Sequence, residues 1–293
     1  MQVARHTFTS TSTGLNPELY PMRLFQKAKK LGVWDPAKID FSQDAADWQS
    51  LSDIERDLLL RLTAQFIGGE ESVTYDLLPL LLVAADEGRI EEEMFLTSYL
   101  FEEAKHVEGF ARFLSKVVGD HGDLSHYLTP SYCRIFMEEQ PAAMNRLRTD
   151  ASPIALAEAA VTYQMITEGV LAETGYHAYF TVLKEHNLMP GMQELVQNIQ
   201  RDESRHIGYG IFLLSRLIAE HGDEIWDAIE ARMNELFPIV LNHITETLAS
   251  YDPIPFGVTL EGFMSFGMGQ FQKRHARLVK ARGKTLDAVL HGR

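Results

Sequence analysis

Two copies of one short motif, Glu-x-x-His, constrain this chain more than any other feature of its sequence. The first copy joins Glu103 to His106, and the second joins Glu203 to His206. In each copy both residues share a helix face with apolar residues at helical spacing, so they belong to an apolar stripe. A buried, ionised carboxylate is unstable unless a positive charge meets it, and helical spacing puts no lysine or arginine on this face. The motifs therefore predict bound metal ions.

A bundle that holds two metal ions in its core needs one further inward glutamate from each of its two remaining helices. Candidates lie about 35 residues upstream of each motif, at Glu70 and at Glu168. Both stand among apolar residues at helical spacing. On this pattern alone, Glu71 could take the place of Glu70. One Glu-x-x-His alone is usually a surface glutamate beside a core histidine. Two copies, each preceded by an inward glutamate at a similar interval, predict a dinuclear site.

Composition excludes several classes of function. A net charge of −14 argues against a nucleic-acid partner, because phosphates would be repelled. The longest apolar run, residues 77–85, contains Pro79 and is far shorter than the roughly 20 residues of a membrane helix. The N-terminus lacks the apolar core of a secretory signal, so we expect a cytoplasmic protein. A single cysteine, Cys133, excludes an internal disulfide framework.

Helical periodicity covers most of the chain, and strand signals are almost absent. We expect helices over residues 22–31, 52–85, 89–118, 130–148, 153–184, 190–220, 223–249 and 260–281, with a capping box at Ser52 and Glu55 and an N-cap at Ser152. Residues 32–53 have no helical period and are expected to wrap around the outside. Short connections between long helices predict an all-α fold: an up-and-down four-helix core with additional peripheral helices. Residues 1–293 then form a single domain, with an irregular segment 1–20 and a loose tail 283–293.

Carboxylate and imidazole ligands suit iron and manganese, and no thiolate is present to favour zinc or copper. Glutamates can bridge two such ions. Open coordination positions on a redox-active pair would let dioxygen bind between the metals. The leading class of function is therefore an oxidase or oxygenase.

Several segments resemble the ribonucleotide reductase small-subunit group of the ferritin-like superfamily, and in particular its ligand-binding oxidase branch. The segments are FIGGEESVTYD, FEEAKH, AAVTYQMITEG, AETGY and RDESRH, and the resemblance covers most of residues 20–250. It implies a ferritin-like homodimer that activates dioxygen at a site of one manganese and one iron ion, or alternatively two iron ions. The implied ligands are Glu70, Glu103 and His106 on the manganese side and Glu168, Glu203 and His206 on the iron side, with Glu103 bridging.

The same resemblance assigns roles to further residues. It implies that a long-chain fatty acid, or another apolar carboxylic acid, lies against the metals in an apolar channel. Candidate lining residues are Phe66, Phe110, Met165 and Leu171. It also implies an ether cross-link between Val73 and Tyr163, and an electron path from Trp34 through Asp202 to His106. From spacing alone Val73 and Tyr163 are ordinary core residues, and Tyr163 lies about 140° around an α-helix from Glu168.

Two features separate the chain from a radical-generating reductase subunit. Phe110 stands four residues after His106, where those subunits generally carry a tyrosine, although their manganese/iron subclass has phenylalanine too. No tyrosine follows Tyr251, so the C-terminal tyrosine used for radical transfer is missing. Two rivals stay open: the small subunit of a manganese/iron ribonucleotide reductase, and a non-catalytic ferritin-like metal-binding protein. The sequence identifies neither the physiological substrate nor which metal occupies which side.

Overall fold

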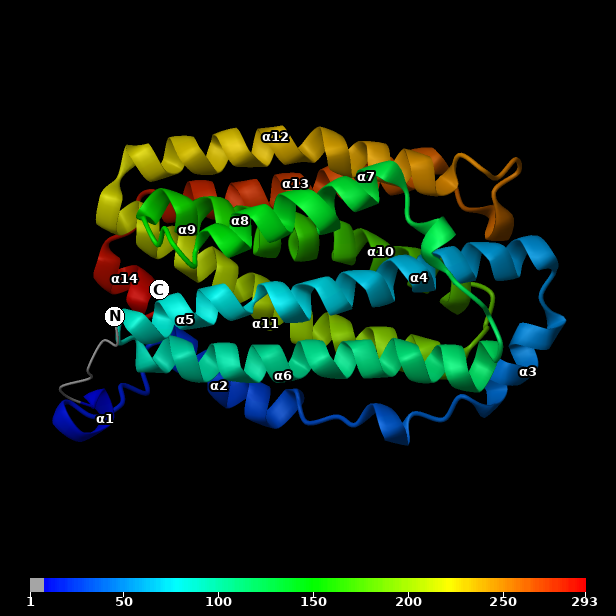
Figure 1. Ribbon diagram of the computed structural model, residues 1–293, viewed down its shortest axis with the longest axis horizontal. Coiled ribbons are helices and arrows are strands. Elements are labelled where there is room, and N and C mark those ends of the chain that lie inside the picture. Colours follow the sequence, from blue (N-terminus) through cyan, green and yellow to red (C-terminus); the bar gives the residue numbers. More distant parts are fainter. Residues whose placement is uncertain (1–7) are drawn as a thin grey trace.

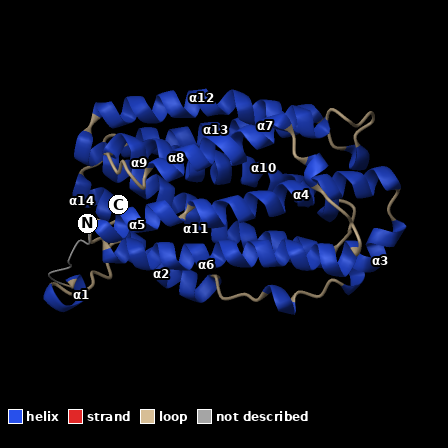
Figure 2. Ribbon diagram, in the orientation of Figure 1, coloured by secondary structure: helices blue, strands red, loops and turns tan. Residues whose placement is uncertain are grey.

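The structure is a computed structural model that describes residues 8–293. Over these residues helix follows helix and no strand occurs (Figure 2), so the prediction of an all-α fold is confirmed. The long helices run side by side along the long axis of the molecule (Figure 1). No helix among the described residues combines the length and apolar character needed to cross a membrane.

Four long helical segments form the core of the bundle. They are α4 (Asp53–Asp76), α6 (Ile90–Phe113), the segment of residues 153–184, and α11 (Pro190–His221). The third segment is made of α9 (Pro153–Ala160), the π-helix η5 (Val161–Ala172), α10 (Glu173–Tyr179) and the π-helix η6 (Phe180–Lys184). Helix α4 packs on α6, η5 packs on α11, and α6 also contacts α11. A hydrogen bond from Tyr163 of η5 to the backbone oxygen of Val73 joins η5 to α4, so the four segments surround one interior.

Further helices cover this core. Helix α2 (Tyr20–Leu31) packs against both α6 and α11, while α12 (Asp223–Leu248) and α13 (Leu260–Ala281) pack against η5. Figure 1 shows α12 and α13 along one side of the molecule and α2 along the other. The remaining short elements are α1 (Thr9–Ser12), η1 (Pro36–Lys38), α3 (Ser42–Ser50), α5 (Leu78–Asp86), η2 (Leu114–Val118), η3 (Ser125–Tyr127), α7 (Pro130–Cys133), η4 (Arg134–Glu139), α8 (Gln140–Arg146), η7 (Pro255–Gly257) and α14 (Leu286–Leu290).

The predicted starts of two core helices are confirmed. The backbone N–H of Ser52 donates to Glu55 Oε2 at 2.8 Å, which is half of the capping box that opens α4. The hydroxyl of Ser152 accepts from the backbone N–H of Ala155 at 3.3 Å and caps α9.

The expected helix 52–85 breaks at Leu77 into α4 and α5. The reason is Pro79, which has no N–H to bond the carbonyl of Tyr75 and whose ring clashes with a continuing α-helix. The expectation of a non-helical segment 32–53 is also wrong, because this stretch contains η1 and α3. Helix α3 carries the buried Asp44, whose carboxylate accepts from the backbone N–H groups of Gly191 and Met192 at 2.9 and 2.7 Å. It thereby caps the start of α11.

The two ends of the chain differ from expectation in one respect. The segment before α2 contains only the single turn α1 within its described part, as an irregular segment should, and residues 1–7 lie outside the described residues. The C-terminal stretch 283–293 is not a loose tail, because it folds into α14 and packs on α11. Thr285 caps this helix, and its apolar side buries Val289.

Candidate metal centre

The six predicted ligands all point into the interior of the bundle. Helix α6 contributes Glu103 and His106, α11 contributes Glu203 and His206, α4 contributes Glu70, and η5 contributes Glu168. Every one of these side chains is buried, whereas Glu71 is exposed. The structure thus separates the two adjacent glutamates of α4 that periodicity alone left open.

These side chains form two overlapping groups. Ligand atoms of Glu70, Glu103, His106 and Glu203 lie within 4.8 Å of one another, and so do those of Glu103, Glu168, Glu203 and His206. The imidazole Nδ1 of His106 is 3.2 Å from Glu70 Oε2, and Nδ1 of His206 is 3.1 Å from Glu103 Oε1. Glu103 and Glu203 belong to both groups. The arrangement therefore offers two neighbouring cation sites that share two carboxylates.

The interior carries more negative charge than the protein itself neutralises. No lysine or arginine of residues 8–293 pairs with any of the four carboxylates. Both oxygens of Glu103 and one oxygen each of Glu168 and Glu203 find no hydrogen-bond donor of good geometry within the described chain. Four ionised carboxylates with two neutral imidazoles carry a charge of −4, which two divalent cations would cancel. The residues therefore fit a pair of metal ions.

Burial changes the acidity of these groups in different directions. It raises the pKa of Glu70 to about 8, although the adjacent His106 opposes the shift. Burial and the neighbouring Glu203 likewise raise the pKa of Glu168 well above its usual value. Glu103 is also buried, but the two histidines beside it lower its pKa to about 2. Without metal, several of these groups therefore hold protons that two cations would displace.

A second layer of charged side chains orients the histidines in a crossed pattern. The Nε2 of His106, on α6, lies 3.4 Å from Asp202 Oδ2 on α11. The Nε2 of His206, on α11, lies 2.9 Å from Glu102 Oε2 on α6. With Nε2 facing a carboxylate, Nδ1 of each ring is left to face the metal site. Arg205 links the two halves, because its guanidinium pairs with both Glu102 and Asp202.

The predicted contact of Trp34 with Asp202 is present, while other members of this layer were not expected. The indole Nε1 of Trp34 donates to Asp202 Oδ2 at 2.8 Å. Glu102 and Lys105, which helical spacing placed away from the apolar stripe, are both buried. The sequence did contain a signal for them. Both motifs have an acid before the glutamate and a cation before the histidine, as EE-x-KH and DE-x-RH.

Val73 and Tyr163 lie in contact beside the two groups. The hydroxyl of Tyr163 donates to the backbone oxygen of Val73 at 2.9 Å, and both side chains are buried. The expected angle of about 140° between Tyr163 and Glu168 is wrong, because residues 161–172 form a π-helix. Its i→i+5 hydrogen bonds bring residues five apart to the same side. Tyr163 therefore faces the site without having to reach around the helix.

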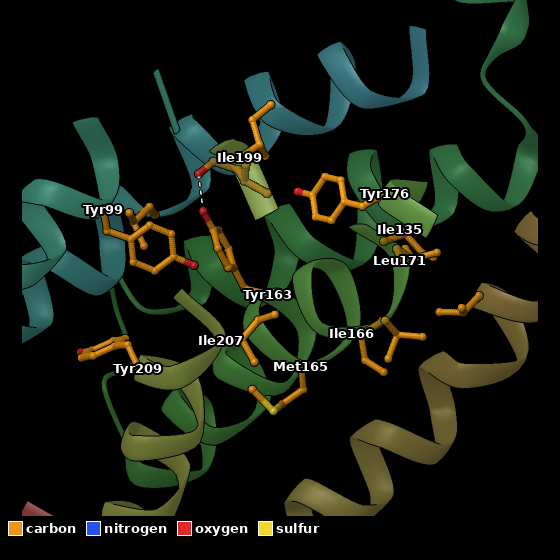
Figure 3. Packing of buried hydrophobic residues seen from close by; sticks show 14 of the residues in the cluster. Tyr99, Ile135, Tyr163, Met165, Ile166, Leu171, Tyr176, Ile199, Ile207 and Tyr209 are labelled. Carbon is orange, nitrogen blue, oxygen red and sulfur yellow. Dashed lines mark hydrogen bonds between the residues drawn. The ribbon is translucent and has the colours of Figure 1, made fainter. Parts of the chain in front are cut away.

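Tyr99 is a further residue of the site that the sequence interpretation missed. Its hydroxyl donates to Glu168 Oε1, and its ring stacks on His206 with centroids 3.5 Å apart. Figure 3 shows Tyr99, Tyr163 and Tyr176 around one buried region, with the hydrogen bond of Tyr163 drawn as a dashed line. Tyr99 lies four residues before Glu103 on α6. This spacing places both side chains on one helix face and was the available signal.

An apolar cavity extends from the carboxylates along α4. Its lining runs from Glu70 and Glu168 past Phe66 and Leu171 to Leu58. The span from Leu58 to Glu70 is twelve residues, or about 18 Å of α-helix. Of the four expected lining residues, Phe66 and Leu171 line this cavity.

The other two expected lining residues lie outside the cavity. Phe110 is buried behind Phe66, with the two rings stacked 5.2 Å apart, so Phe66 separates it from the cavity. Met165 is buried against α11, at the position where Gly210 leaves room for it.

Comparison with known proteins places the chain in a family. Residues 22–266 match the family described as ribonucleotide reductase, small chain. A structure of the R2-like ligand-binding oxidase from Sulfolobus acidocaldarius is 37% identical with a TM-score of 0.90, covering 98% of this chain and 99% of that chain. The chain belongs to this family, in the branch of the R2-like ligand-binding oxidases. It is accordingly a metal-dependent oxidoreductase, and the predicted family and fold are confirmed.

Two further solved members of the branch carry cofactors. One is a valine-to-isoleucine variant with an aerobically reconstituted Mn/Fe cofactor, 35% identical with a TM-score of 0.91 and covering 94% of this chain and 99% of that chain. The other is a tyrosine-to-phenylalanine variant with an anaerobically reconstituted Mn/Fe cofactor, 35% identical with a TM-score of 0.91 and covering 94% of this chain and 99% of that chain. These oxidases are similar to this chain over nearly its whole length.

Proposed function

We propose that this oxidase activates dioxygen at a pair of one manganese and one iron ion. The observation that carries the proposal is the set of four buried carboxylates that no lysine or arginine of the described chain neutralises. Glu70, Glu103 and His106 would hold manganese, with Glu168, Glu203 and His206 on the iron and Glu103 between them. When bound, the pair supplies redox equivalents for the reduction of dioxygen. The Mn/Fe cofactors of the solved neighbours support this assignment.

The first substrate of the oxidising centre is the protein itself, through an ether bond between Val73 and Tyr163. The contact between the Tyr163 hydroxyl and the Val73 backbone supports this step, as do the two groups of carboxylates beside it. The Cβ–H bond of Val73 and the O–H bond of Tyr163 break, a C–O bond forms, and two electrons and two protons leave. Reducing dioxygen to two waters takes four electrons and four protons. Oxidising each bound metal ion by one step would supply the other two electrons, and solvent would supply the other two protons.

The ligand that we propose for the cavity along α4 is a long-chain fatty acid. Its walls are mainly apolar from Leu58 to Phe66, and its inner end is formed by Glu70, Glu168 and Glu203. A fatty acid has the matching distribution of chemistry, with an apolar chain and one carboxylate that can bind a metal ion. Its chain would replace water along the wall, and its head group would lie at the cations.

Peptide mass spectrometry after metallation tests the proposed reaction. Metal-free protein would be loaded with manganese and iron in air, desalted, and divided between elemental analysis and trypsin digestion. We expect one ion of each metal per chain and a species joining residues 62–89 to residues 149–184, lighter than the two separate peptides by two hydrogen atoms. Anaerobic loading and the Tyr163→Phe variant are the controls, and neither should give the joined species. Full metal occupancy in air with both peptides unmodified would overturn the cross-link, and two iron ions per chain would replace the mixed site by the di-iron alternative.

A further inference from the structure

A buried lysine lies over the one tryptophan that contacts the metal-site network. The ammonium group of Lys105 is 4.3 Å from the ring centroid of Trp34. It donates to the carbonyl oxygen of Gly32 at 2.6 Å and to Asp202 Oδ2 at 3.2 Å. Both partners are acceptors, as an ammonium group requires. The charge of Lys105 is thus fixed against the face of the indole ring.

Trp34 is also connected to the site through the same oxygen atom. Its Nε1 donates to Asp202 Oδ2, which faces Nε2 of His106 as well. The rings of Trp34 and His106 are nearly parallel, with centroids 6.2 Å apart. Since Trp34 is partly exposed, this contact chain leads from a candidate metal ligand toward solvent. It is the route by which an oxidised metal centre would draw an electron from outside.

We infer that Lys105 is a positioning residue that keeps Trp34 in its reduced form. Transfer of one electron from the indole to the oxidised centre would reduce one metal ion by one step and leave a radical cation on Trp34. That positive charge would lie 4.3 Å from the ammonium group, in surroundings where charges are poorly screened. The attraction between the ammonium and the neutral ring would be lost as well. The oxidised centre therefore takes electrons from Val73 and Tyr163 and not from Trp34, a consequence that rests on the proposed function.

The backbone around Lys105 is built to hold the charge in place. A Cβ atom at Gly32 would lie 1.9 Å from Glu102 Oε1, so a side chain at this position would require Glu102 to move away from the carbonyl that Lys105 bonds. Lys105 and Arg205 supply two positive charges against the two negative charges of Glu102 and Asp202, and all four are buried. Arg205 is the counterpart of Lys105 in the second motif, yet it lies over no aromatic ring of residues 8–293. Of the two histidine sides of the site, only that of His106 has a charge over an indole ring.

The first test uses metal-free protein, so that its outcome does not depend on the proposed reaction. Trp48→Phe and Trp226→Phe leave Trp34 as the sole tryptophan of the chain. A photogenerated ruthenium(III) complex serves as the one-electron oxidant, and oxygenated Trp34 is quantified in the tryptic peptide 31–38. We expect Lys105→Met and Lys105→Gln to increase its yield about fivefold or more, whereas Lys105→Arg, which keeps the charge, should stay near the parent.

Lys29→Met is the matched control, because it removes an exposed ammonium that lies 5.2 Å from the centroid of Phe25. It should leave the oxidation of Trp34 unchanged. Acrylamide quenching of Trp34 fluorescence must be equal in all variants, so that a change in accessibility is excluded. Equal oxidation of Trp34 in the parent, in both neutral variants and in Lys105→Arg would overturn the inference.

The second test follows the metal-loaded protein in air. Lys105→Met should form less of the Val73–Tyr163 product and more oxygenated Trp34, and adding Trp34→Phe should restore the cross-link. An unchanged cross-link yield together with unoxidised Trp34 in Lys105→Met would contradict the proposed role. Absence of any cross-link in the parent would overturn the proposed function instead, while the metal-free test would still decide the role of Lys105.

Discussion

Glu70 and Glu71 are adjacent in the chain and have opposite surroundings. The side chain of Glu70 is buried beside His106, and that of Glu71 is exposed. Identical chemistry at neighbouring positions offers a direct comparison of a metal ligand with a surface charge.

Glu70→Gln should reduce metal binding from two ions per chain to about one. The amide keeps the size of the side chain but removes the charge that one of the two cation sites needs. Elemental analysis after loading and desalting measures the ratio, and Glu71→Gln should still bind two ions. Two ions bound with parental affinity in Glu70→Gln would show that Glu70 is not a ligand.

Glu102 acts on the metal through His206. Glu102→Gln should weaken metal binding by about 10-fold to 100-fold, which is typical when the outer partner of a histidine ligand is lost. Competition with a chelator measures the affinity, and Glu108→Gln, at an exposed position of the same helix that pairs with Arg112, is the control. Equal affinities in the two variants would mean that Glu102 only balances the charge of Arg205.

Helical periodicity predicted the burial of Glu103 and His106 but not that of Glu102 and Lys105, because different neighbours bury the two pairs. Glu103 and His106 lie in the apolar stripe of α6, so the local pattern predicts their burial. Glu102 and Lys105 lie beside that stripe and are buried only because α2 packs against α6 and α11. The helical period of residues 101–110 does not contain this information, because it depends on where a distant helix packs. The only signal was the acid and the cation that recur in the second motif. Burial on a second face of a helix is therefore a tertiary property.

At the level of elements, the π-helix η5 decides which side chains meet. Its residues 161–172 carry an ordinary apolar pattern that predicts an α-helix, and the family resemblance alone suggested that Tyr163 faces the site. The i→i+5 hydrogen bonds are compatible with the sequence but not required by it. Helices α11, α12 and α13 pack around η5, so the surrounding bundle contributes to selecting this geometry. The long helices could be predicted from the sequence, and Pro79 is a signal for the break between α4 and α5, whereas the π-helical turns could not be predicted.

Arg274 of α13 bonds η5 directly, and its removal should destabilise the protein. Its buried Nε donates to the carbonyl oxygen of Gly169 at 3.0 Å, next to Glu168. Arg274→Met would leave that carbonyl without this donor, at a cost of about 1–3 kcal/mol in the free energy of unfolding. Chemical unfolding measures the loss, and Arg277→Met, on the exposed side of α13, should change stability by less than about 0.5 kcal/mol. Equal stabilities of the two variants would contradict a structural role for this bond.

At the scale of the whole molecule, the bundle encloses four carboxylates within a large apolar core. Folding without metal places Glu70, Glu168 and Glu203 where burial raises their pKa values. The native protein then binds more protons than the unfolded chain around neutral pH. Metal ions that bind only the native state stabilise it by mass action and displace these protons. Stability, proton binding and metal binding are therefore linked.

The linkage predicts that metal-free protein loses stability as the pH rises from about 5 to about 8. A raised pKa in the native state, such as that of Glu70 at about 8, gives stability that is complete below the unfolded value and is lost as the pH passes through the native value. The raised pKa values of His106 and His206 act in the same direction. The lowered pKa of Glu103, at about 2, changes stability only at more acidic pH.

Denaturant unfolding at intervals of pH measures this profile. For the metal-free protein we expect the free energy of unfolding to fall by a few kcal/mol across this range, since each pKa unit corresponds to about 1.4 kcal/mol. Glu70→Gln should flatten the profile because it removes one of the titrating groups, whereas Glu71→Gln should leave it unchanged. Saturation with divalent ions should raise stability most at high pH, where the native carboxylates have lost their protons and repel one another. A metal-free profile that rises from pH 5 to pH 8 would contradict the buried, uncompensated charge on which the metal centre depends.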